Sequence, residues 1–495
     1  MTSGGGVDRA SLRAHAASGV KWTALSSGAL FACSLAQLAV LGRLLTPADF
    51  GLMAMATVVL GFAYVFADAG LSNAVVYKQH SSRNILSTLY WTNVLVGVAL
   101  AACLWLVSPL AGLFYRDPAV VGLLRLAAYV LPVVALGQLP LALLERDLAF
   151  RRIAPIEIAS AVVGIVVAIG TAALGQGPRS FVWGQLATAA VRSLGLLGLV
   201  WRTWRPSLHF ARSDLRGYLG FGAYQLGERT VNYWAANVDY LVVGRFLGPE
   251  SLGPYTVAYQ LAAVPMQRMN PVLTRVAFPV LARTQSDSER LLRGYLKLVK
   301  AVAFLSFPLL AGLAVCASIA VPLIAGGGWL QAVPIVQVLC VMGAMKVLAS
   351  TTGSLLLAKG RADVGFWWNV FTMVVTATCL ILVVSEGILM VALAQAVLSI
   401  IFLALLLGIL KRVSGLSVTS FVGAAARPLV ATGIMATAVA AVLIPLGMAA
   451  LPAALTLSCC AFVGAASYGL AWRLLEKGYI RSMWREMIGS QERSS

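Results

Sequence analysis

Six basic residues fall inside stretches of the sequence that are otherwise apolar and long enough to cross a membrane as helices. A charge at the centre of a bilayer is unfavourable unless it faces a water-filled cavity or an oppositely charged partner. Guanidinium groups bind phosphate-like anions through two parallel hydrogen bonds. The cations are Arg125, Arg192, Arg229, Arg268, Arg275 and Lys346, and the fewer acids are Asp68, Glu157, Glu228 and Asp239. A cavity lined by these side chains would be net positive and suited to an anion.

Four polar residues of the stretch 219–246 form one stripe. Gln225, Arg229, Asn232 and Asp239 are spaced by 4, 3 and 7 positions, so they share one face of a helix. On an otherwise apolar helix this face is predicted to line a cavity and bind an anionic head group. The alternative is that the stripe makes hydrogen bonds to neighbouring helices.

One acid of the stripe and one acid beside it are candidates for ion coupling. Asp239 and Glu228 are predicted to bind a Na⁺ ion or a proton whose gradient drives the protein. Asp239 has a second interpretation, in which it neutralises Arg229 or Arg245. No metal-ligand spacing or other cofactor motif is present, and the seven cysteines fall within the apolar stretches.

The stretch 254–280 combines cations with prolines. Arg268 and Arg275 are seven positions apart and share a helix face. Pro265 and Pro271 lie nearby, and prolines at this density kink a helix. A bend there is predicted to act as a hinge that controls access to the cavity, with a static kink as the alternative.

The elements that must position these residues are membrane-spanning helices. The chain has 495 residues, of which 60% are hydrophobic and 11% charged. Soluble domains carry roughly 25% charged residues. About fourteen spans are predicted, which makes the chain an all-α polytopic membrane protein. They cover 18–42, 51–76, 85–108, 119–144, 156–174, 181–201, 219–246, 254–280, 298–320, 334–357, 365–385, 387–410, 424–446 and 451–473.

Charge predicts the orientation. Lys and Arg concentrate in alternate loops and at both termini, which places those segments in the cytoplasm. The opposite side carries few basic residues: Arg43, Arg116, Arg179 and Arg245. The net charge of +19 is scattered over short loops, so nucleic-acid binding is not indicated. The basic segment 281–297 is amphipathic and is predicted either to lie on the inner leaflet or to form a solvated helix.

An internal repeat organises the chain. Residues 42–51 read GRLLTPADFG and residues 244–253 read GRFLGPESLG, an offset of 202 residues. Both copies follow the first span of a half, which indicates a duplication of six spans with parallel orientation. The predicted parts are an N-terminal lobe (1–201), a cytoplasmic linker (202–218), a C-terminal lobe (219–412), two additional spans (413–474) and a cytoplasmic tail (475–495). Arg43 and Arg245, at equivalent places, are predicted to cap helix C-termini.

The repeat, the segment FADAGLSNAVVYK and the segment NVDYLVVGRFLGPESLGPYTVAYQLAAVP resemble the Wzx-type polysaccharide and O-antigen flippases. The resemblance is to the colanic-acid and xanthan type, within the multidrug/oligosaccharidyl-lipid/polysaccharide (MOP) exporter superfamily, and covers about residues 18–412. It implies two six-helix lobes around a central cavity in the bacterial inner membrane. It also implies flipping of undecaprenyl-diphosphate-linked oligosaccharide, for exopolysaccharide or lipopolysaccharide synthesis. Membrane lipids, a polysaccharide polymerase and other assembly proteins are the further expected partners.

Two other functions stay open at this point. A drug or small-molecule exporter of the same superfamily would favour an acidic cavity, whereas this one is predicted to be basic. A polysaccharide polymerase or ligase usually presents a long outer loop, and every outer loop predicted here is short. No nucleotide-binding loop or catalytic set is recognisable, so a transporter is predicted rather than an enzyme.

Overall fold

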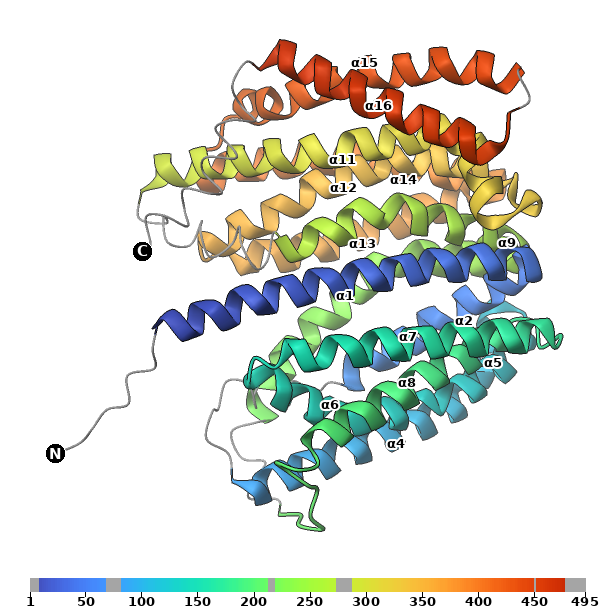
Figure 1. The fold of residues 1–495 in the computed structure, drawn as a ribbon, viewed down its shortest axis with the longest axis vertical. Helices are drawn as coiled ribbons and strands as arrows, with labels where there is room; N and C mark the ends of the chain where they lie inside the picture. The colour runs from blue at the N-terminus through green and yellow to red at the C-terminus, as the bar shows by residue number, and fades with distance from the viewer. Residues whose placement is uncertain (1–8, 68–81, 212–218, 273–286, 449–450, 477–495) are drawn as a thin grey trace. The chain divides into compact units, whose positions relative to one another are not determined.

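The computed structural model describes residues 9–67, 82–211, 219–272, 287–448 and 451–476, and within these ranges the chain is helical and contains no strand (Figure 1). A few helical segments are described by their backbone alone: 9–25, 219–226, 228, 265–272, 357–358 and 362. The predicted all-α polytopic fold is confirmed.

A helix occupies every predicted span. The first helices, in chain order through the second copy of the repeat, are α1 (Arg9–Leu44), α2 (Pro47–Ala67), α4 (Arg83–Tyr115), α5 (Ala119–Ala128), α6 (Val130–Arg146), α7 (Phe150–Ala173), α8 (Arg179–Val200) and α9 (Leu219–Val272). The remainder are α11 (Ser288–Ala325), α12 (Ala332–Ala358), α13 (Ala362–Val383), α14 (Ile388–Ser414), α15 (Val418–Met448) and α16 (Ala453–Leu475). Among the described residues, 11 helical stretches are long and apolar enough to cross a membrane.

The predicted separation of 219–246 and 254–280 is kept: both lie in α9, where the non-helical backbone of Gly248, at φ 77°, divides two helices. Two other elements differ from the prediction. The span 119–144 consists of two consecutive helices, α5 and α6. The segment 281–297 does not form a separate surface helix over its described residues. There α11 begins at Ser288, and Leu291 and Tyr295 are fully buried in a core with other helices.

The chain divides into two compact units. The first contains Met1–Pro254 and Ile324–Gly328, and the second contains Tyr255–Leu323 and Trp329–Ser495. These units are defined by packing, whereas the predicted boundary at 202–218 separates the two copies of the duplicated sequence. The first half of α9 therefore belongs to the first unit although it begins the second copy.

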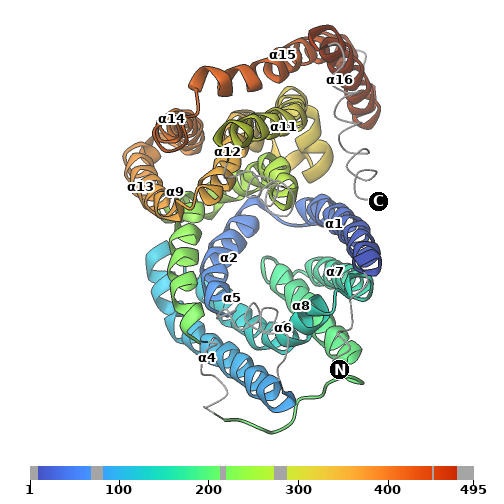
Figure 2. The same ribbon diagram turned by 90° about the vertical axis from the view of Figure 1, so that its left-hand side faces the viewer.

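In the first unit, neighbouring helices follow the order α1, α7, α8, α6, α4, α5 and α2. Figure 2 shows these helices nearly end on, and the order can be followed there. A core of large apolar side chains joins α4, α6, α7 and α8, and includes Leu89, Leu139, Ile153 and Leu196. The hydroxyl of Ser207, which follows α8, hydrogen-bonds Ser87 of α4 at 2.9 Å.

In the second unit, α11 supplies two cores. Its first turns pack with α12, α14 and α15 through Tyr295, Leu355, Leu407 and Phe421. Further along, Phe304 contacts Tyr468 and Trp472 of α16, and the Tyr468 hydroxyl donates to the Phe304 carbonyl at 2.9 Å. The additional helices α15 and α16 are thus anchored on α11.

Candidate functional site

The two copies of the repeat contact each other in the first unit. A β-carbon on Gly51 would overlap the backbone of Pro249, and a β-carbon on Gly253 would overlap the backbone of Pro47. Pro47 and Pro249 are equivalent positions of the repeat, as are Gly51 and Gly253. The contact is therefore reciprocal, as in a twofold-symmetric interface. Only glycine permits so close an approach of two backbones.

The arginine of each copy of the repeat hydrogen-bonds a helix of the other copy. Arg43, in the first copy, donates from Nη1 to the carbonyl of Ile324 at 3.0 Å, near the end of α11. Arg245, in the second copy, donates from Nη1 to the carbonyl of Leu113 at 3.5 Å, near the end of α4. The α4 and α11 helices are the third of their copies, so each arginine caps a helix of the other copy. The prediction of helix C-terminal capping is confirmed.

We call these eight residues the crossed joint: Gly42, Arg43, Pro47, Gly51, Gly244, Arg245, Pro249 and Gly253. The two copies differ in how the helix after the joint begins. In the first copy Thr46 and Asp49 form a capping box at the start of α2, with Thr46 Oγ1 bonded to the carboxylate at 2.8 Å. In the second copy Gly248 occupies the place of Thr46 and turns the chain through a left-handed conformation.

The predicted polar stripe lies on α9. Arg229 is half-buried, Asn232 is exposed and Asp239 is buried, with 1% of its surface exposed. The Asp239 carboxylate accepts from the Tyr240 amide at 3.0 Å. The side chains of Gln225 and Glu228 lie outside the description. The predicted partner Arg245 contacts Leu113 and the ring of Phe114.

Aromatic residues beside the stripe were not predicted. The Tyr233 hydroxyl donates to the Val58 carbonyl of α2 at 2.6 Å. Trp234 lies against Phe62 of α2, with ring centroids 4.5 Å apart. In the sequence, two adjacent aromatic residues follow Asn232. This pattern is equally typical of ordinary helix packing, so it did not indicate these contacts.

Lys346 lies half-buried in α12 of the second unit. Its ammonium donates to the Tyr259 hydroxyl at 3.4 Å and sits 5.3 Å from the centre of that ring. One turn earlier, Gly343 lies against the carbonyl of Ala262, which keeps α12 close to the second half of α9. Lys346 is thus held by an aromatic hydroxyl and ring face.

Two other predicted anion ligands have partners within the first unit. Arg192 of α8 forms an ion pair with Glu157 of α7 at 3.2 Å, and Ser26 of α1 donates to the same carboxylate at 3.4 Å. The guanidinium of Arg125 lies 4.5 Å from the centre of the Trp105 ring. These contacts connect helices, so they give both arginines a packing role.

The remaining predicted residues are described in part. Arg268, Pro265 and Pro271 belong to α9, which is helical through them, but their side chains lie outside the description. Arg275 lies outside the described residues. Among those that are described, no group of three or more His, Cys, Asp and Glu side chains is placed to hold a metal ion.

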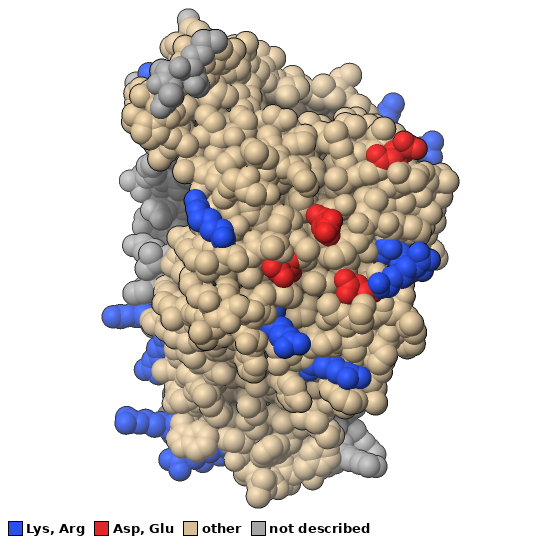
Figure 3. All heavy atoms as spheres, turned by 90° about the vertical axis from the view of Figure 1, so that its right-hand side faces the viewer, with Lys and Arg blue, Asp and Glu red and all other residues tan. Residues whose placement is uncertain are grey.

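Surface charge is sparse at the end of the molecule where α1 ends. Figure 3, which views that side, shows a largely uncharged face with a few separate acidic and basic side chains. At the start of α13, Arg361 and Asp363 form an ion pair. The guanidinium donates to both carboxylate oxygens at 2.9 and 3.0 Å, and this contact raises the pKa of Arg361.

Comparison with solved structures gives the fold. The fold matches the lipid II flippase MurJ in an inward closed conformation, with a TM-score of 0.74 and 15% identity, over 92% of this chain and 99% of that one. It also matches an inward-facing multidrug resistance MATE transporter of the MOP superfamily, with a TM-score of 0.55 and 14% identity, over 80% and 96% of the two chains. The chain therefore shares the helical fold of these two structures.

Comparison with sequences gives the family. Residues 40–334 match the model of a family described as polysaccharide biosynthesis protein. The chain is 31% identical to the teichuronic acid biosynthesis protein TuaB of Bacillus subtilis, over 84% of this chain and 87% of that one. It is 34% identical to the lipopolysaccharide biosynthesis protein WzxC of Escherichia coli, over 73% of each.

The chain belongs to the polysaccharide biosynthesis protein family. The resemblance to Wzx-type flippases is confirmed, and so is the expectation of a transport protein rather than an enzyme.

Proposed function

We propose that the protein flips undecaprenyl-diphosphate-linked oligosaccharide repeat units from the cytoplasmic to the periplasmic leaflet of a bacterial inner membrane. The units would serve exopolysaccharide or lipopolysaccharide synthesis. Family membership and the fold shared with a lipid II flippase support this proposal. The observation that carries it is that each unit holds a partly exposed cation within a long helix, Arg229 in one and Lys346 in the other. Such cations suit a diphosphate.

In this mechanism Arg229, Arg268, Arg275 and Lys346 hold the diphosphate while the cavity opens alternately to each side. Gln225 and Asn232 would hydrogen-bond the sugar, with Arg125 and Arg192 kept as secondary candidates. Asp239 and Glu228 would bind the coupling Na⁺ or proton, and Pro265 and Pro271 would provide the hinge. Both termini would be cytoplasmic, as the loop charges predict.

The test uses a strain that lacks the protein. Lipid-linked oligosaccharide is quantified, and its leaflet is determined by protection from a glycosidase added to the periplasm. Accumulation of protected repeat units is expected. Accumulation of single, accessible units would instead indicate a polymerase or ligase, and unchanged lipid-linked oligosaccharide with altered drug resistance would indicate a drug exporter.

Complementation with variants then tests the site. Arg229→Ala and Lys346→Ala should each lower the rate of flipping about ten-fold or more, since a hydrogen bond to a charged group is lost. Arg290→Ala is the control, because Arg290 is exposed at the start of α11. Full activity of both site variants, at normal abundance in the membrane, would remove these residues from the binding site.

A further inference from the structure

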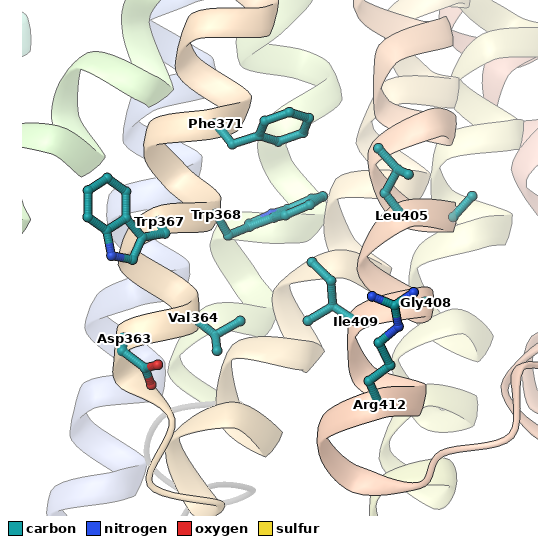
Figure 4. A pocket seen from close by; sticks show the side chains of 10 residues that line it. Asp363, Val364, Trp367, Trp368, Phe371, Leu405, Gly408, Ile409 and Arg412 are labelled. Atoms are coloured by element: carbon teal, nitrogen blue, oxygen red, sulfur yellow. The ribbon is translucent and has the colours of Figure 1, made fainter.

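A groove runs between α13 and α14 in the second unit. Its volume is about 640 Å³, and it is open along one side (Figure 4). Its lining comes from one face of each helix: Asp363, Val364, Trp367, Trp368, Phe371, Ala404, Leu405, Gly408, Ile409 and Arg412. None of these residues was among the predicted site residues.

One wall of the groove is aromatic. Trp368 and Phe371 extend from α13 toward α14, and their ring centroids are 5.7 Å apart (Figure 4). Phe402 of α14 meets both rings, at 6.0 Å from Trp368 and 6.2 Å from Phe371. Trp367 is 68% exposed. Exposed aromatic surface of this kind is favourable against hydrocarbon and is typical of membrane interfaces.

The opposite wall leaves space where two of its residues, Ala404 and Gly408, are small. A β-carbon on Gly408 would meet no atom within 4 Å, so the space beside this glycine is empty of protein. The neighbouring Ala404 contributes only a methyl group. The groove therefore has room beside α14 for a chain of methylene groups.

The charge of the groove is concentrated at one end. Asp363 is neutralised by Arg361, which donates to both of its carboxylate oxygens. Within the described part of the chain, the Arg412 guanidinium has no carboxylate partner. Its side chain runs along α14 so that the guanidinium lies near Gly408 and Ile409 (Figure 4). A single cation thus remains at the end of an apolar groove.

The surroundings identify a lipid as the occupant. The exposed side chains of α14 between its start and the groove are apolar, as expected of a helix face in hydrocarbon: Leu389, Met390, Leu393, Val397, Ile400, Ile401 and Leu405. Lys411 and Arg412 follow at the end that the loop charges predict to be cytoplasmic. The lining contains no Ser, Thr, Asn or Gln side chain that would bind an oligosaccharide.

We propose that the groove between α13 and α14 binds one anionic phospholipid of the inner leaflet, with its phosphate on Arg412 and an acyl chain against Trp368, Phe371 and Gly408. Guanidinium–phosphate contact supplies the preference for anionic lipid, and the aromatic wall supplies the affinity for the chain. None of the cations assigned to flipping lines the groove.

The test measures lipid retention by native mass spectrometry of the purified full-length protein. Phosphatidylglycerol and phosphatidylcholine are added at equal concentration. Wild type should retain one phosphatidylglycerol in preference to phosphatidylcholine. Arg412→Gln should weaken phosphatidylglycerol binding about five-fold, the contribution of one basic residue near an anionic lipid. Gly408→Leu should weaken binding of both lipids, because the side chain fills the groove.

Matched controls separate the groove from general effects. Lys411→Gln removes the neighbouring exposed cation, and Gly423→Leu places the same side chain at an open, exposed position of α15. Both should bind as wild type does. Equal retention of the two lipids by wild type, or wild-type binding by Arg412→Gln and Gly408→Leu, would overturn the proposal. Displacement of phosphatidylglycerol by undecaprenyl diphosphate at an equal concentration, dependent on Arg412, would also overturn it in favour of a substrate lipid.

Discussion

Gly51 lies so close to the backbone of Pro249 that no side chain fits between them, and the equivalent pair Gly253 and Pro47 repeats the contact. A duplicated sequence has therefore produced an internal interface that resembles the isologous contact of a homodimer. Because both contacts involve backbone atoms, neither can relax by changing a side-chain rotamer.

Alanine at either glycine of the crossed joint should be destabilising by a similar amount. Gly51→Ala and Gly253→Ala each force the two backbones apart, at a cost of about 1–3 kcal/mol for overpacking. Thermal unfolding of the purified proteins measures the effect. Gly122→Ala is the control, because a β-carbon there meets nothing within 4 Å. Two variants as stable as this control would contradict the contact.

The crossed arginines should contribute to stability in the same way. Arg43→Gln and Arg245→Gln remove a cation from the end of a helix, which is worth about 0.3–1 kcal/mol. Arg179→Gln, at the exposed start of α8, should change little. The measurement is the unfolding midpoint of each variant. If the Arg179 variant lost as much stability as the other two, the loss would come from the change in net charge and not from helix capping.

Arg192 and Glu157 should behave as a coupled pair. Removing one partner leaves the other charge unbalanced in a membrane-spanning helix, whereas removing both does not. The double variant Arg192→Gln/Glu157→Gln should therefore lose less stability than the sum of the single variants, with a coupling of about 0.5–3 kcal/mol. If the pair serves packing alone, the double variant retains flipping. Loss of flipping in a stable double variant would make Arg192 a substrate ligand after all.

Glu476 should stabilise the end of the second unit. Its carboxylate accepts from Lys300 of α11 and from Arg427 of α15, the latter at 2.6 Å, and it is 11% exposed. Glu476→Gln should lower the free energy of unfolding by about 1–3 kcal/mol, the cost of weakening a buried charged hydrogen bond. Glu289→Gln is the control, because Glu289 is 80% exposed in its pair with Arg293. Equal effects of the two substitutions would show that burial of Glu476 contributes nothing.

The helices were predictable because a membrane leaves the backbone few choices. Apolar length located every span, and the spacing of the repeat indicated a duplication. The break of α9 at Gly248 falls between the predicted spans 219–246 and 254–280. The basic residues near Ser288 suggested a surface helix, but Leu291 and Tyr295 are buried by helices distant in sequence.

Side-chain partners were less predictable. Arg192 and Glu157 lie 35 residues apart on two helices, so their pairing depends on how those helices pack. The groove was even less predictable from the sequence, because Trp368 and Arg412 become neighbours only when α13 lies beside α14. A pattern on one helix shows which face is polar, but it does not show what lies opposite.

The bond from Arg43 to Ile324 joins residues 281 positions apart. During synthesis, the first unit has all its other residues in place by Pro254, yet residues 324–328 come only after most of α11 has been made. The N-terminal half must therefore wait in the membrane without the Ile324 carbonyl that Arg43 binds until the ninth predicted span is inserted. Assembly of the two halves is in this way coupled to the order in which the ribosome delivers them.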